Sequence, residues 1–131
     1  PRVSAAPERG GVFDPGPRPL LSSDCSGGGR APPAETAASI DKRELHDGLA
    51  LWARIDAPWL AAVGRDRFTA ACRPLRDLAP RLILGSHLPP AVDLDDALYA
   101  GLDAAREAAP FVGPDQAALE QAIHAPEPAV V

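Results

Sequence analysis

Two short apolar runs, each ending at a polar loop, constrain the fold of this chain more than any other feature. The first is Leu20-Leu21, which leads through two serines to Asp24, and the second is Leu82–Leu84, which leads through Gly-Ser to His87. Short apolar runs bounded by Pro or Gly are typical of buried strands. Helical patterns occupy the sequence between them. We therefore expect an α/β protein in which a few short strands pack with about four helices.

A β-hairpin is predicted at the first apolar run. Val12 and Phe13 form a short strand, an Asp-Pro-Gly turn follows at 14–16, and a second strand runs from Leu20 to Ser23. Prolines in this segment are compatible only with the turn and with an edge position of the sheet.

Four helices are predicted from apolar residues spaced by three or four positions. The first begins at Ser39 or Asp41 and ends before Pro58, the second begins near Arg65, Asp93 caps the third, and Gly113-Pro114 opens the fourth, which Pro126 ends. The predicted inward residues are Leu45, Leu49, Trp52 and Ile55; Phe68, Ala71, Cys72, Leu75 and Leu78; Leu94, Ala97, Leu98, Leu102 and Ala105; and Leu119, Ala122 and Ile123. Pro74 lies inside the second pattern, where it should kink the helix or mark a restart.

Asp24 and His87 are the candidate metal ligands. Carboxylate oxygen and imidazole nitrogen are a ligand pair that iron, zinc and manganese sites share. Because each residue follows a predicted buried strand and begins a polar loop, we expect both at the same edge of a small sheet, close enough for one metal to bridge. The alternative is that Asp24 caps a turn and His87 only bonds to backbone.

The other residues with reactive side chains have structural interpretations. His46 should face solvent, and His124 suits the dipole at the end of the last helix. Cys25 and Cys72 are expected to be reduced thiols that form no disulfide, with Cys72 in the core. Acidic residues at 93, 95 and 96 are explained by a helix start, where negative charge is favourable.

Composition excludes several classes of function. A net charge of −5 argues against a nucleic-acid binder. No apolar run is long enough to span a membrane, no signal peptide is evident, and a cytoplasmic location is expected. The Ser26-Gly-Gly-Gly-Arg loop lacks the Lys-Ser/Thr of a phosphate-binding loop, which argues against a nucleotide-binding domain. The length allows one domain, predicted over 1–125, with a disordered tail at 126–131.

Several segments resemble one known family. They are Ser-Ser-Asp-Cys after two leucines, Leu-Gly-Ser-His-Leu-Pro-Pro after the second apolar run, Gly-Val-Phe-Asp-Pro at 11–15, and the stretches 52–60 and 111–120. Their order resembles the C-terminal portion of a metallo-β-lactamase-fold domain. The nearest branch is the β-lactamase-like domain of flavodiiron and related oxygen-binding diiron proteins.

The resemblance implies the C-terminal half of an αββα sandwich that holds two divalent metal ions, iron or zinc. Asp24 corresponds to the bridging carboxylate and His87 to the last histidine. The parent protein would hydrolyse its substrate with metal-activated water or carry out diiron chemistry on oxygen or nitric oxide, and the second is favoured over β-lactam hydrolysis. FMN is not expected on this chain.

The main ligand cluster of the family has no counterpart here. The chain is therefore expected to be inactive and marginally stable alone, and to need the N-terminal half of the domain or a homo-oligomer as partner. Whether it is part of an enzyme stays open. The alternative is a non-catalytic relic of the fold, or a small helical interaction domain without metal.

Overall fold

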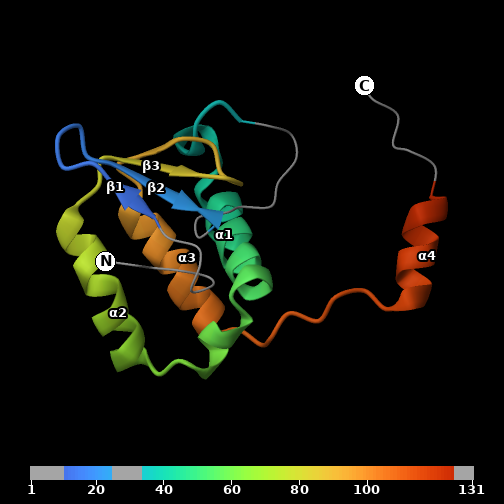
Figure 1. Cartoon of the computed structure of the whole chain (residues 1–131). Helices are drawn as coiled ribbons and strands as arrows, with labels where there is room; N and C mark the ends of the chain where they lie inside the picture. The colour runs from blue at the N-terminus through green and yellow to red at the C-terminus, as the bar shows by residue number, and fades with distance from the viewer. Residues whose placement is uncertain (1–10, 25–33, 126–131) are drawn as a thin grey trace.

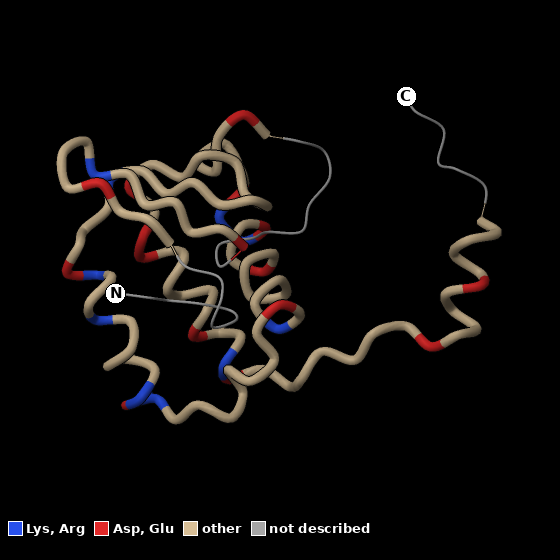
Figure 2. Tube along the Cα trace, viewed as in Figure 1, with Lys and Arg blue, Asp and Glu red and all other residues tan. Residues whose placement is uncertain are grey.

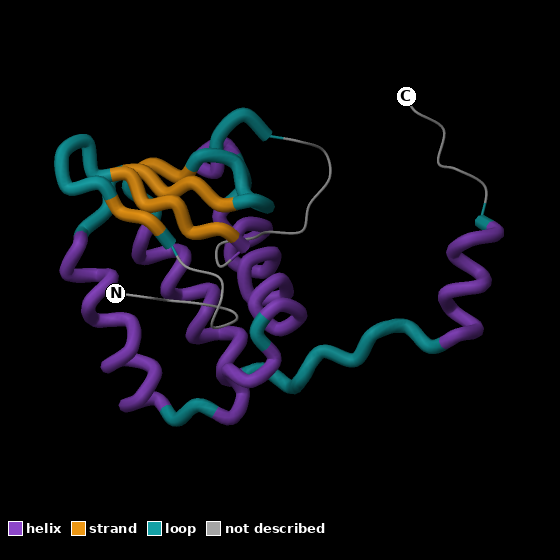
Figure 3. Tube along the Cα trace, in the orientation of Figure 1, coloured by secondary structure: helices purple, strands orange, loops and turns teal. Residues whose placement is uncertain are grey.

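A four-stranded mixed sheet lies on one layer of helices, so the predicted α/β class is confirmed (Figures 1 and 3). The computed structural model describes residues 11–24 and 34–125. Its strands are β1 (Val12–Phe13), β2 (Pro19–Ser23), β3 (Leu82–Gly85) and β4 (Ala91–Val92). Its α-helices are α1 (Lys42–Asp56), α2 (Arg65–Leu78), α3 (Asp95–Glu107) and α4 (Gln116–His124), with short 3₁₀ helices η2 (Ala37–Ser39) and η3 (Pro58–Ala62).

The sheet has the order β1-β2-β3-β4, with a parallel pair at its centre and an antiparallel strand on each side. β2 and β3 are paired in register from Pro19 with Leu82 to Leu21 with Leu84, and α1 and α2 form the crossover between them. Parallel strands require such a long crossover. Because the central strands are parallel, the loops that follow them begin at the same edge of the sheet.

The predicted hairpin is confirmed, whereas the second edge strand was not predicted. Asp14 closes the hairpin turn: its side chain accepts from the Gly16 N–H at 2.8 Å, and its own N–H donates to the Pro19 carbonyl at 3.1 Å. β4 pairs antiparallel with β3 but contains only two residues. A strand that short, directly after Pro89-Pro90, has no alternating pattern from which to predict it.

The core lies between the inner face of the sheet and the helices α1 and α3. Its large residues include Leu45 and Leu49 from α1, Leu98 from α3, Ile83 from β3 and Leu88 from the loop after it. Asp41 caps the start of α1, because its side chain accepts hydrogen bonds from the N–H groups of residues 43 and 44. Asp41 was one of the two predicted caps of this helix.

Some predicted helix details are wrong. Ile55 was predicted to face inward but is exposed, because the buried stripe of α1 continues through Ala53. Ala71 was also predicted to face inward but is exposed, because α2 buries only a narrow stripe that includes Cys72. Asp93 does not cap α3: the cap position is Leu94, and Asp93 takes a left-handed φ of 52° while its N–H donates to the Arg81 carbonyl.

Two predictions for α2 have clear outcomes. The helix begins at Arg65 as predicted and continues through Pro74 to Leu78 without a break. Cys72 is buried, as predicted, and this burial raises the pKa of its thiol. The predictions for Cys25, the glycine loop and the tail at 126–131 concern residues outside the described ranges.

The last helix lies apart from the sheet and the other helices (Figure 1). Asp115 caps α4, accepting from the Ala118 N–H through its side chain, and the helix runs from Gln116 to His124. Gly113-Pro114, the predicted opening, precedes the helix. The predicted inward residues of this helix, Leu119, Ala122 and Ile123, are all exposed, so this prediction is wrong. The pattern predicted an amphipathic helix correctly but not whether its apolar face is covered. Among the described residues, no helix combines the length and the apolarity that a membrane crossing requires.

The outer face of the sheet is apolar and open to solvent. Leu21 and Val92 are 47% and 50% exposed, and Val12, the partner of Leu21 in the register, is exposed as well. Leu84, the other partner of Leu21, lies on the same face. Helices α1, α2 and α3 all lie on the opposite side of the sheet (Figure 3). Sheets that contain parallel strands normally have both faces covered.

We predict that the same substitution has different effects at two neighbouring residues of β2, because their side chains lie on opposite faces of the sheet. Leu21→Thr places a β-branched residue in the strand and removes exposed apolar surface, so it should reduce self-association in analytical ultracentrifugation with a small effect on stability. Leu20→Thr, the matched change on the inner face, should lower the free energy of unfolding by about 2 kcal/mol. Equal effects of both changes would contradict the assignment of the two faces.

Helices α1 and α3 approach closely at Gly101. A Cβ atom built on Gly101 would lie 2.6 Å from the Cβ of Leu49, which is fixed to the α1 backbone and cannot rotate away. Gly101 is therefore required by packing, although glycine is a poor helix former.

Gly101→Ala should destabilise the protein, against the helix propensity of alanine. Propensity alone would stabilise by about 1 kcal/mol, whereas overpacking against Leu49 should cost about 1–3 kcal/mol. Chemical denaturation decides the sign. The control is Ala100→Gly at the preceding exposed position, which should destabilise by about 1 kcal/mol through propensity. A more stable Gly101→Ala protein would show that α1 and α3 can separate at this point.

Candidate metal centre

Asp24 and His87 are delivered to one edge of the sheet by the two parallel strands. Asp24 follows the last residue of β2, and His87 stands two residues after β3. A register shift between Leu21 and Ser23 and the left-handed φ of 51° at Ser23 bend the chain just before Asp24. The Ser86 N–H donates to the carbonyl of Ser23, the last residue of β2, at 2.9 Å. This hydrogen bond holds together the starts of the two loops.

The two side chains meet. The Oδ1 atom of Asp24 lies 3.4 Å from the Nε2 atom of His87, with the carboxylate 23% and the imidazole 46% exposed. Two atoms that bind one tetrahedral metal ion at about 2 Å each lie about 3.3 Å apart. The spacing therefore suits two ligands of one ion. It also suits an ion pair between a carboxylate and a protonated imidazole, so metal binding itself stays a prediction.

Trp52 is a third member of this cluster that was not predicted to belong to it. Its indole N–H donates to the backbone carbonyl of Asp24 at 2.9 Å. Its ring lies against the His87 imidazole, with ring centroids 4.3 Å apart and planes inclined by 35°. The spacing of apolar residues predicted an inward position on α1, but no local signal connects a helix residue with two distant loops.

Two protein ligands leave a metal site incomplete. Within 11–24 and 34–125, no three or more His, Cys, Asp or Glu residues gather so that they could hold a metal ion. Structural zinc sites use four protein ligands and catalytic sites three. A tight site would need ligands in addition to Asp24 and His87.

The other candidate residues remain apart from this edge. His46 is exposed, as predicted, and its Nδ1 atom lies 3.2 Å from the neighbouring Asp47 carboxylate. His124 lies in the last turn of α4, as predicted, and is also exposed. Asp95 and Asp96 lie in the first turn of α3, as the helix-start interpretation predicted. Arg76 of α2 pairs with Asp96 and lies over the Tyr99 ring.

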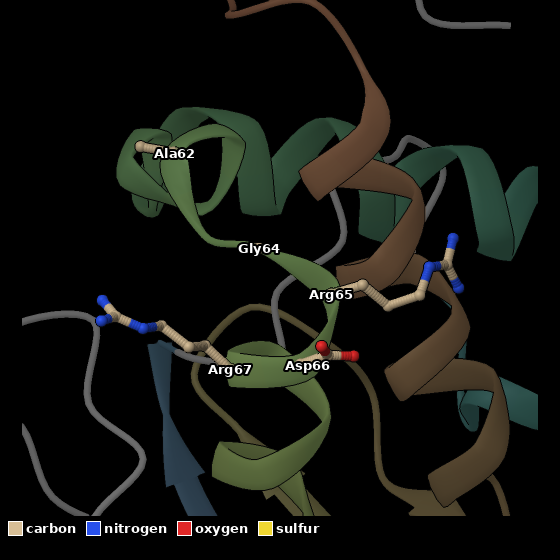
Figure 4. Close-up of a pocket in the computed structure, with 5 residues that line it drawn as sticks. All are labelled: Ala62, Gly64, Arg65, Asp66 and Arg67. Atoms are coloured by element: carbon tan, nitrogen blue, oxygen red, sulfur yellow. The ribbon is translucent and has the colours of Figure 1, made fainter.

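Two arginines of α2, Arg65 and Arg76, face acidic partners on α3. Arg65 pairs with Asp103 and Glu107, and acidic and basic positions are interspersed along this part of the trace (Figure 2). A surface pocket of about 420 Å³ lies at the start of α2, lined by residues 62 and 64–67. Figure 4 shows that Arg65 and Arg67 point to opposite sides, so the two guanidinium groups do not converge on a ligand there.

Comparison with protein-family models, with curated proteins and with solved structures yields no match. The geometry of the Asp24–His87 edge and the sequence resemblance are therefore the observations that bear on function.

Proposed function

We propose that Asp24 and His87 are two ligands of a dinuclear metal centre in a domain that resembles the C-terminal half of the metallo-β-lactamase fold. The observation that supports this most is the 3.4 Å spacing of Oδ1 and Nε2 at the carboxyl edge of the β2–β3 pair. Ligands at the ends of neighbouring strands, supported by a sheet and a helix, need little rearrangement when an ion binds.

The two residues would have different tasks. A carboxylate has two oxygen atoms and can contact two cations, so Asp24 suits the bridging position, whereas neutral His87 can bind one ion through Nε2. The pair contains oxygen and nitrogen donors only, which suits iron and is also accepted by zinc. When bound there, metal ions would supply either activation of a water for hydrolysis or a site for oxygen. Of these two, we favour the oxygen or redox chemistry.

The remaining ligands must come from outside the described residues. The apolar outer face of the sheet, with Val12, Leu21 and Val92 exposed, is the surface where a second sheet would complete a sandwich. A sheet packed there would share the edge at which Asp24 and His87 lie, and its own loops could supply ligands. We propose the other half of the same fold as this partner, with a second copy of the chain as the alternative.

A second candidate function is a protein-interaction domain without metal. The exposed apolar side chains of α4, Leu119 and Ile123, favour it, because an isolated amphipathic helix suits a groove on another protein. In this case Asp24 and His87 would form only an ion pair. The two candidates differ in what zinc does to the His87 imidazole.

Zinc should bind weakly to the isolated chain, and only through this edge. The dissociation constant for zinc should be larger than about 1 μM, because two protein ligands leave most of the coordination sphere to water. Asp24→Asn removes the charge and should weaken binding by at least about tenfold, which corresponds to about 1.4 kcal/mol. Nuclear magnetic resonance of the imidazole protons during zinc titration measures both quantities.

The exposed pair His46–Asp47 provides a matched control. Asp47→Asn removes a carboxylate next to an imidazole elsewhere on the same helix layer and should leave zinc binding at His87 unchanged. Sub-micromolar affinity that depends on Asp24 would show that the chain supplies more ligands than proposed. Zinc shifts that are identical in Asp24→Asn and in the original protein would overturn the metal function.

A further inference from the structure

Trp52 connects the two loops that carry the candidate ligands. It lies on α1, whereas Asp24 follows β2 and His87 follows β3. Its N–H reaches the backbone carbonyl of Asp24 and its ring faces the imidazole of His87, so one half-buried side chain contacts both. Neither contact uses the atoms that would bind a metal.

We propose that Trp52 is a positioning residue that sets the relative placement of the Asp24 carboxylate and the His87 imidazole. The inference rests on the proposed metal function, which it extends by one residue. Residues that orient metal ligands without touching the metal commonly change affinity by 10- to 100-fold.

The hydrogen bond holds the backbone at a point where the sheet no longer does. Asp24 lies after the register shift of β2, and the left-handed residue Ser23 directly precedes it. The indole N–H is a donor only, and the carbonyl of Asp24 accepts it at 2.9 Å. Loss of this donor would let the backbone of Asp24 rotate, and with it the direction of the carboxylate.

The ring contact limits the rotation of the imidazole. The His87 side chain is nearly half exposed, so packing restrains only part of the imidazole. At a centroid distance of 4.3 Å, the indole face is in direct contact with the imidazole, and a large turn of the imidazole would collide with it. The imidazole is thereby held with Nε2 toward Asp24.

Helix α1 gives Trp52 a rigid base. Asp41 caps the helix through two hydrogen bonds, and Leu45, Leu49 and Ala53 are buried in the layer between the sheet and α3. A side chain supported in this way can transmit the position of the helix to the two loops. The support is independent of any metal.

The test compares Trp52→Phe, which keeps a ring but removes the N–H donor, with Trp52→Leu, which removes both. The chain has only one other tryptophan, Trp59, which is exposed in η3, so Trp59→Phe is the matched control. Circular dichroism checks that each variant is folded. The readouts are the imidazole proton shifts of the three histidines and the zinc affinity measured from them, with His46 and His124 as internal references.

The His87 protons should be shifted upfield by the Trp52 ring current in the original protein and in Trp59→Phe. Trp52→Leu should abolish this shift, and Trp52→Phe should retain part of it. Zinc affinity at His87 should fall about 10-fold in Trp52→Phe and up to about 100-fold in Trp52→Leu, with no change in Trp59→Phe. A merely structural role would lower stability without selectively lowering zinc affinity in the folded variants.

The outcomes separate this inference from the proposed function. If zinc binds at His87 with equal affinity in all four proteins, the positioning role is overturned while the metal function stands. If the His87 shift is unchanged in Trp52→Leu, the positioning role is overturned as well. If zinc does not perturb His87 in the original protein, the metal function is overturned together with the inference that depends on it.

Discussion

The contact between α1 and α3 at Leu49 and Gly101 is the constraint on which the rest of the structure depends. The absence of a side chain at Gly101 lets the two helices approach until only the Leu49 side chain separates them. This places α1 under the sheet, where Leu45 and Leu49 meet Ile83 in the core. Trp52 lies three residues, nearly one turn, beyond Leu49. The packing of the helix layer therefore also decides where the indole meets the two loops.

Three kinds of contact hold the loops at the candidate metal edge. The β2–β3 ladder brings the loops together, the Ser86–Ser23 hydrogen bond extends this pairing, and Trp52 contacts both loops, with its N–H on the Asp24 carbonyl and its ring against His87. The outer face of the same sheet remains apolar and exposed. A partner layer outside the described residues would account both for an edge with only two candidate ligands and for the uncovered face next to it, which is why we favour a sandwich over an isolated interaction domain.

Local patterns predicted the elements that local physical chemistry determines. The hairpin turn at Asp14, the start of α1 at Asp41 and the start of α2 at Arg65 all follow from short-range preferences, and the structure confirms them. The apolar runs predicted β2 and β3, and hence that Asp24 and His87 would share an edge. This much of the candidate site was accessible without coordinates.

The wrong predictions concern features that are determined by tertiary contacts and not by local sequence. Ile55 and Leu119 are apolar at helical spacing, yet within the described part of the chain neither side chain is covered by another element, and both are nearly half exposed. Asp93 has the right side chain for a cap, but the turn after β4 places it in a left-handed conformation. The role of Trp52 requires three segments to meet, and no periodicity contains that information.

The most direct test of the metal centre is the position of a metal atom. Crystals of the full chain grown with excess zinc should show anomalous scattering at the zinc edge between Asp24 and His87, about 2 Å from both Oδ1 and Nε2. The same crystals should show no comparable peak at the His46–Asp47 pair. Zinc bound elsewhere, with Asp24 and His87 still 3.4 Å apart and joined only as an ion pair, would contradict the account.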